Sequence, residues 1–218
     1  LVVYNMADTF FIGLTGNDNM LTAVTVCMPA FMILSAIANL FGVGGASVIA
    51  RQLGNHQRDR AGYAASFAFW GCIAVTLLYS LLCILLVDVY VNLLGGVDPA
   101  VHEYARGYLL CTVGVGGLVT SLNSLLAHLL RSEGHSAQAG LGVAMGGILN
   151  IALDPLFMLV IMPKGMEPLS AAIATALSNL LATVYFLLVI FRRRHHTVLQ
   201  LKPTRHALRG GIPGRVLS

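Results

Sequence analysis

Long apolar stretches alternate with short polar segments along almost the whole chain. Because a helix needs about 20 mainly apolar residues to cross a bilayer, five stretches are predicted to be transmembrane helices: roughly 21–50, 61–87, 104–130, 137–162 and 169–191. A shorter apolar stretch, 1–14, is interpreted as the later part of a further helix. The polar segments are predicted to be connecting loops: 15–20, 52–60, 88–103, 131–136 and 163–168. The pattern therefore predicts an all-α integral membrane protein with a six-helix transmembrane lobe.

The composition supports a protein that is surrounded by lipid. Of the 218 residues, 57% are hydrophobic and only 10% are charged, whereas soluble domains carry about 25% charged residues. So few charges could not cover the surface of a soluble protein of this size. No block of basic residues alternates with aromatic residues, so no nucleic-acid partner is expected.

The basic residues are distributed unevenly between the two sides of the predicted helices. Eleven Lys and Arg residues fall on one side, seven of them after residue 191, whereas Arg106 and Lys164 fall on the other. Lys and Arg near helix ends favour the cytoplasmic side. We therefore expect a multi-pass protein of the cell membrane with a cytoplasmic tail. Residues 1–194 are interpreted as the six-helix lobe, and 195–218 as a basic linker to a seventh helix that this sequence lacks.

An acid lies where lipid-facing residues are expected. The apolar stretch 141–162 contains Asp154, with Asn150 one helical turn before it and Pro155 directly after it. Because charge inside hydrocarbon is costly, such a residue indicates a functional site. Pro155 also removes the hydrogen bond to the carbonyl of Ile151. A carboxylate, an amide oxygen and a free carbonyl are hard donors that suit Na⁺ or a proton. The alternative is that Asn150 and Asp154 only join two helices through polar contacts and that Pro155 only kinks the helix.

A second acid, Asp8, lies in the first apolar stretch. If it faces Asp154, two carboxylates share one site of low dielectric and can carry a single proton between them. Asn5 and Thr9 would supply further polar contacts. The alternative is that Asp8 caps a helix end near the outer surface. Three polar residues of the last stretch either join helices or contribute to a ligand site: Thr175, Ser178 and Asn179.

Five short segments, in order along the chain, resemble one transporter family. They are 4–13 (YNMADTFFIG), 42–54 (beginning GVGGAS and ending RQLG), 129–134 (LLRSEG), 150–155 (NIALDP) and 171–175 (AAIAT). Together they are similar to the N-terminal half of the multidrug and toxic compound extrusion (MATE) family. The acid in the first helix, Asp8, resembles the DinF-like branch of that family.

The resemblance implies a fold of twelve helices in two six-helix lobes with a central cleft and alternating access. It implies a non-enzymatic antiporter in which H⁺ or Na⁺ enters while an amphipathic, often cationic compound leaves, without a further cofactor. The implied cation site consists of Asp8, Asn150, Asp154 and Thr175, with Na⁺ at the first three. Asn5, Ile151 and Pro155 are supporting residues. The expected partner is a C-terminal lobe, without which this half would not form the cleft.

Three alternatives remain open at this stage. A flippase for lipid-linked sugars would have the same helix layout, but it is expected to carry basic residues for pyrophosphate, and the apolar stretches contain almost none. An intramembrane aspartyl protease could use Asp8 and Asp154 to activate water, but the G-x-G-D signature is absent. A purely structural membrane subunit would leave the cost of Asp154 unexplained.

Overall fold

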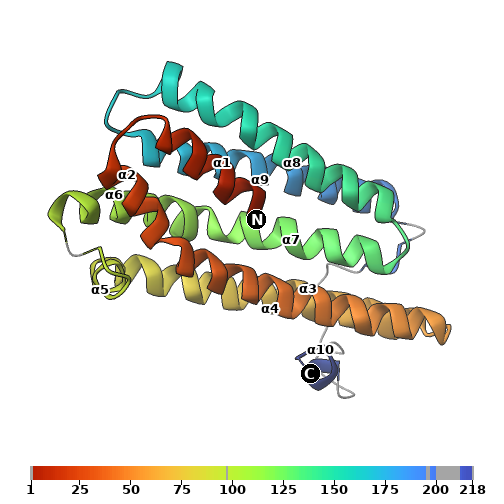
Figure 1. Cartoon of the computed structure of the whole chain (residues 1–218). Coiled ribbons are helices and arrows are strands. Elements are labelled where there is room, and N and C mark those ends of the chain that lie inside the picture. Colours follow the sequence, from red (N-terminus) through yellow and green to blue (C-terminus); the bar gives the residue numbers. More distant parts are fainter. Residues whose placement is uncertain (1, 97, 195–196, 200–211, 218) are drawn as a thin grey trace.

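The computed structural model describes residues 2–96, 98–194, 197–199 and 212–217, and these residues form helices and connecting turns (Figure 1). The α-helices are α1 (Val2–Gly13), α2 (Asp18–Val26), α3 (Met28–Gly54), α4 (Arg58–Leu85), α5 (Val87–Leu93), α6 (Pro99–Leu109), α7 (Gly117–Ser132), α8 (Ser136–Leu156), α9 (Glu167–Arg192) and α10 (Ile212–Leu217). Two π-helical segments, Leu110–Val115 and Phe157–Ile161, follow α6 and α8.

Four helical units in the described part of the chain are long and apolar enough to cross a membrane. They are α2 with α3, α4, α8 with its π-helical extension, and α9. A fifth forms if α6 and α7, which meet at an angle of 49°, are counted as one broken span. The predicted all-α, multi-pass membrane fold is therefore confirmed, and α1 adds a short sixth helix that packs against α8 and α9.

One predicted loop is wrong. The segment 88–103 was expected to be a polar connection, but it contains α5 and the beginning of α6. Helix α6 begins where the Asp98 carboxylate accepts a hydrogen bond from the backbone N–H of Ala100 (2.9 Å) and Pro99 occupies the first turn. Both features are strong signals for a helix start. Because α6 is polar on its outer face, it lacked the long apolar run on which the prediction depended.

The helices of the lobe pack closely because small residues lie between them. A Cβ atom added to Gly142 of α8 would lie 2.3 Å from a ring carbon of Phe186 on α9. One added to Gly45 of α3 would lie 2.7 Å from the Cβ of Ala68 on α4. Without side chains at these positions the helix axes approach closely, as is common in membrane proteins. This close packing brings α8 and α9 together, and these two helices carry most of the predicted site.

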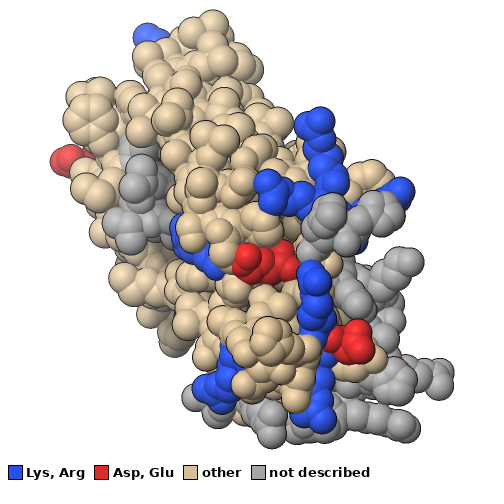
Figure 2. Space-filling view, turned by 90° about the vertical axis from the view of Figure 1, so that its right-hand side faces the viewer, with Lys and Arg blue, Asp and Glu red and all other residues tan. Residues whose placement is uncertain are grey.

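One end of the helix bundle is rich in Lys and Arg. Helices α3, α7 and α9 end there and α4 and α8 begin there, and Figure 2 shows blue basic side chains gathered on this face. We call it the basic end. Arg51, Arg131 and Arg192 lie in the last turns of their helices, where a positive charge also interacts favourably with the helix dipole.

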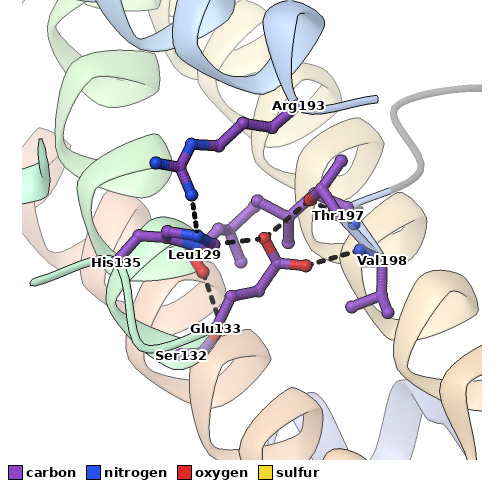
Figure 3. Close-up of polar contacts among 8 residues, drawn as sticks. Leu129, Ser132, Glu133, His135, Arg193, Thr197 and Val198 are labelled. Carbon is purple, nitrogen blue, oxygen red and sulfur yellow. Dashed lines mark hydrogen bonds and ion pairs between the residues drawn. The ribbon is translucent and has the colours of Figure 1, made fainter. Parts of the chain in front are cut away.

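The segment after α9 is held at the basic end by a group of contacts that we call the linker clasp (Figure 3). The carboxylate of Glu133 accepts hydrogen bonds from the Thr197 hydroxyl (2.6 Å) and from the backbone N–H of Val198. The guanidinium of Arg193 contacts the imidazole of His135, whose other ring nitrogen lies 3.8 Å from Glu133. Most of the predicted linker 195–218 lies outside the described residues.

Candidate cation site

Both predicted acids are fully buried inside the lobe. Asp8 lies in the middle of α1 and Asp154 in the last turn of α8, and neither residue is exposed to solvent. The interpretation of Asp8 as a helix cap near the surface is therefore wrong, because five helical residues follow it and the carboxylate points into the bundle. Burial of two carboxylates in one small lobe requires partners for each of them.

A continuous series of hydrogen bonds connects the four predicted site residues. The amide Nδ2 of Asn150 donates to Oδ1 of Asp154 (3.0 Å) and to Oγ1 of Thr175 (3.0 Å). The Thr175 hydroxyl in turn donates to Oδ1 of Asp8 (3.1 Å). Three helices, α1, α8 and α9, thus contribute side chains to one polar cluster. We call these four residues the carboxylate cluster.

A fifth residue, Tyr108, contacts the cluster and was missed in the sequence. It lies on α6, and its phenol hydroxyl donates to Oδ2 of Asp8 at 2.8 Å. Its side chain is 1% exposed, so its hydroxyl needs a buried partner, as is usual for tyrosines inside proteins. A tyrosine within an apolar stretch was a signal for such a contact, but its partner lies 100 residues away in the sequence.

Two oxygen atoms of the cluster have no hydrogen-bond partner among the described residues. They are Oδ1 of Asn150 and Oδ2 of Asp154, and both are buried. The described ion pairs also include neither Asp8 nor Asp154. Unpaired buried charge is strongly unfavourable, so the cluster needs a positive partner. Unpaired amide and carboxylate oxygens fit a proton or a small hard cation such as Na⁺.

The predicted supporting residues take different positions. Pro155 lies inside α8, which continues for one residue before the π-helical segment begins. The side chain of Ile151 faces outward, 48% exposed, and the role of its carbonyl as a ligand stays a prediction. The side chain of Asn5 lies outside the described residues. Ser178 and Asn179 do not reach the carboxylates, because both donate to the backbone carbonyl of Thr175 (3.0 and 2.9 Å).

A multi-pass helical lobe with two buried carboxylates, and with no basic partner for them in the part of the chain that the structure describes, is typical of ion-coupled membrane transporters. The MatE family model matches residues 1–156, and the chain belongs to this family. A multidrug export protein, MepA, from Staphylococcus saprophyticus is 26% identical over 224 residues. The alignment covers 100% of this chain and 49% of that protein.

Solved structures of MATE transporters have the same fold. An inward-facing multidrug resistance transporter of the MATE family superposes on this chain with a TM-score of 0.83 and 27% sequence identity. The superposition covers 99% of this chain and 47% of the transporter chain. A MATE structure in complex with MaD3S gives a TM-score of 0.84 and 27% identity, covering 99% and 48%. The chain thus spans about half the length of the curated relatives it matches, as expected for one lobe.

Proposed function

We propose that this chain is the N-terminal lobe of a cation-coupled antiporter that exports amphipathic or cationic organic compounds across the cell membrane. One observation carries the proposal: two fully buried carboxylates, Asp8 and Asp154, lack a basic partner among the described ion pairs. In addition, Oδ2 of Asp154 and Oδ1 of the neighbouring Asn150 have no hydrogen-bond partner among the described residues. A coupling ion, H⁺ or Na⁺, would supply the missing positive charge.

Ion binding would change how three helices pack. Binding of one H⁺ or Na⁺ removes one negative charge from the pair of carboxylates, so the hydrogen bonds from Thr175 and Tyr108 to Asp8 have less negative charge to compensate. The balance of packing between α1, α8 and α9 then shifts, and access to a cleft beside the lobe changes with it. An ion can shift the equilibrium between two arrangements of these helices only if it binds one arrangement more tightly than the other. The buried acids would provide that difference in affinity.

The exported compound and the second lobe come from the comparison with relatives. MepA of S. saprophyticus is described as a multidrug export protein, and one solved relative was crystallised with MaD3S. By analogy, we expect a small amphipathic compound to bind between this lobe and a second lobe of similar size. None of these relatives is described as a flippase or a protease, so neither alternative is retained. No catalytic step is part of the proposal.

The proposal is tested by replacing Asp154 with asparagine in the complete transporter that contains this lobe. Asp154→Asn keeps the size of the side chain and one oxygen that can accept the hydrogen bond from Asn150, but it removes the charge that attracts the ion. We expect efflux of a fluorescent cationic dye to be lost while the amount of protein in the membrane is unchanged. Asp18→Asn, at an exposed position at the beginning of α2, is the matched control and should transport normally.

Dye efflux and drug resistance at the wild-type level in the Asp154→Asn variant would contradict the proposal. The identity of the coupling ion is measured separately in membrane vesicles. A pH gradient at constant Na⁺ and a Na⁺ gradient at constant pH are applied in turn, and the gradient that drives efflux identifies the ion.

A further inference from the structure

The span formed by α6 and α7 is bent sharply near its middle (Figure 1). The two helices meet at an angle of 49°, and the π-helical segment Leu110–Val115 lies between them. The backbone N–H of Gly116 closes a wide turn by donating to the carbonyl of Cys111, five residues earlier (2.8 Å). No proline occurs between Pro99 and Pro155, so the bend arises from this wide turn. Such turns kink helices and are frequent at functional sites.

Two glycines occupy the bend, and neighbouring atoms leave no room there for a side chain. A Cβ atom added to Gly116 would lie 2.9 Å from the carbonyl oxygen of Thr112 and 3.3 Å from the Cβ of Ala176 on α9. One added to Gly117 would lie 2.9 Å from the hydroxyl of Ser80 on α4. Glycine also has more backbone freedom than other residues. The glycines thus fix where the span bends and allow the angle to change.

Side-chain hydroxyls stabilise the backbone next to the bend. The Ser80 hydroxyl of α4 donates to the carbonyl of Val113 (2.7 Å), and the Thr112 hydroxyl donates to the carbonyl of Tyr108 (2.6 Å). Carbonyls that leave the regular pattern inside a membrane need partners of this kind. In a regular α-helix the Val113 carbonyl would instead accept a bond from the N–H four residues later. The contact with Ser80 therefore favours the bent form.

The two sides of the bend belong to different parts of the apolar core. Leu109 of α6 is buried in one apolar cluster, which also contains Val24 of α2. Leu126 and Leu130 of α7 are buried in a second cluster, together with Ile49 of α3. The bend lies between these two clusters. Each side can therefore keep its own packing while the angle between them changes, which is the requirement for a hinge.

The carboxylate cluster lies beside the bend at two points. The hydroxyl of Tyr108, near the end of α6, donates to the carboxylate of Asp8 (2.8 Å). Ala176, the residue after Thr175 on α9, is the neighbour of Gly116 across the helix interface. Hydrogen bonds to an ionised acceptor are roughly twice as strong as those between neutral groups. Loss of negative charge from the carboxylates therefore weakens the contact that holds α6 to α1.

We propose that the break between α6 and α7 is a hinge whose angle changes when the coupling ion binds to the carboxylate cluster, so that α6 and the helices packed on it move against the basic end. The inference rests on the proposed function, because the ion is the one that the buried carboxylates bind. It adds a moving element that lies outside the cluster. Glu103 lies about 20 Å along the span from Gly116, so a change of about 15° in the angle moves it by about 5 Å.

The hinge is tested by distances between spin labels in the complete transporter. The labels are attached at Asn55→Cys, in the turn after α3 at the basic end, and at Glu103→Cys on α6, because both positions are exposed. The native cysteines are first replaced by alanine: Cys27, Cys72, Cys83 and Cys111. Double electron–electron resonance is measured in lipid nanodiscs at low and high pH, and with and without Na⁺. We expect the ion to change the distance by about 3–5 Å.

A second pair of labels is the matched control. It keeps Asn55→Cys and places the other label at Leu85→Cys, an exposed position at the end of α4. Helix α4 is continuous from Arg58 to Leu85 and packs along α3. The distance between positions 55 and 85 should therefore not depend on the ion.

Two substitutions test the bend itself. Gly116→Ala adds a methyl group that the wide turn cannot accept without shifting, so the ion-dependent change in the 55–103 distance should be lost, and efflux with it. Gly107→Ala is its control on α6, because no atom of another residue lies within 4 Å of the added Cβ. Ser80→Ala adds no atom and removes only the hydroxyl that favours the bent form. It should also abolish the distance change, and it serves where Gly116→Ala does not fold.

Three results would overturn the hinge. They are a 55–103 distance that does not respond to the ion, an equal response of both label pairs, and a full response in a folded Gly116→Ala or Ser80→Ala variant. The distance measurement requires ion binding but no export. If Asp154→Asn abolishes efflux while the 55–103 distance in the otherwise unchanged transporter stays constant, the hinge fails and the proposed function stands. Normal efflux by Asp154→Asn would contradict the function itself.

Discussion

The hydroxyl of Tyr108 on α6 donates a hydrogen bond to the carboxylate of Asp8 on α1, in addition to the packing of α1 against α8 and α9. We predict that Tyr108→Phe destabilises the protein by about 1–3 kcal/mol, because Oδ2 of the buried Asp8 carboxylate loses its closer donor and keeps only the longer contact with the Thr175 hydroxyl (3.3 Å). The measurement is the temperature at which the detergent-solubilised transporter loses its monodisperse peak in size-exclusion chromatography. Tyr90→Phe is the control, since the Tyr90 hydroxyl pairs with Tyr79 at a partly exposed position. Equal melting temperatures for wild type and Tyr108→Phe would contradict the prediction.

At this scale, the sequence revealed those site residues whose relation is local. Asn150 and Asp154 are four residues apart on a helix, and this spacing alone placed them on one face. The structure brings Asp8 and Thr175 to the same cluster, as the family resemblance implied. Tyr108 could not be found in this way. Its contact with Asp8 depends on where α6 lies relative to α1, which no local spacing determines.

At the scale of elements, the linker clasp fixes the chain that leaves α9. The side chain of Glu133 is 6% exposed and its carboxylate binds two groups of the segment 197–199. We predict that Glu133→Ala speeds tryptic cleavage after Arg193 and Arg194 roughly tenfold, because hydrogen bonds to a charged acceptor contribute about 1.5–3 kcal/mol. The readout is the fragment pattern of the solubilised protein over time.

The control for the clasp is Glu103→Ala. Glu103 is an exposed residue of α6 and lies far along the chain from the segment after α9. This variant should be cut at the wild-type rate. If Glu133→Ala and Glu103→Ala were cut equally fast, the clasp would not hold the segment. If the clasp does hold it, a movement of the turn between α7 and α8 is passed directly to the segment after α9.

Prediction of the elements succeeded where apolar length decided the outcome. Helices α4 and α9 agree with the predicted stretches to within a few residues, because a bilayer imposes a minimum apolar length on each span. Prediction failed at α5 and α6, which are short or amphipathic and pack at one end of the bundle. The π-helical segments were also missed, because no residue pattern distinguishes one wide turn from the α-helix around it.

At the scale of the whole molecule, the uneven distribution of charge predicts one orientation in the membrane. Basic residues gather at the end where α3, α7 and α9 terminate (Figure 2), whereas the turn between the second π-helical segment and α9 carries Lys164 alone. Since Lys and Arg in short loops are retained in the cytoplasm, the basic end and the linker clasp should both face the cytoplasm.

This orientation is measured with reporters fused at two positions. Green fluorescent protein fused after Arg194 should fluoresce, and alkaline phosphatase at the same position should be inactive. Fused after Gly165, at a turn with positive φ, the two reporters should give the opposite result. The two sites differ by a single crossing of α9, so each serves as the control for the other. Active phosphatase after Arg194 would place the basic end outside the cell and would contradict the predicted orientation.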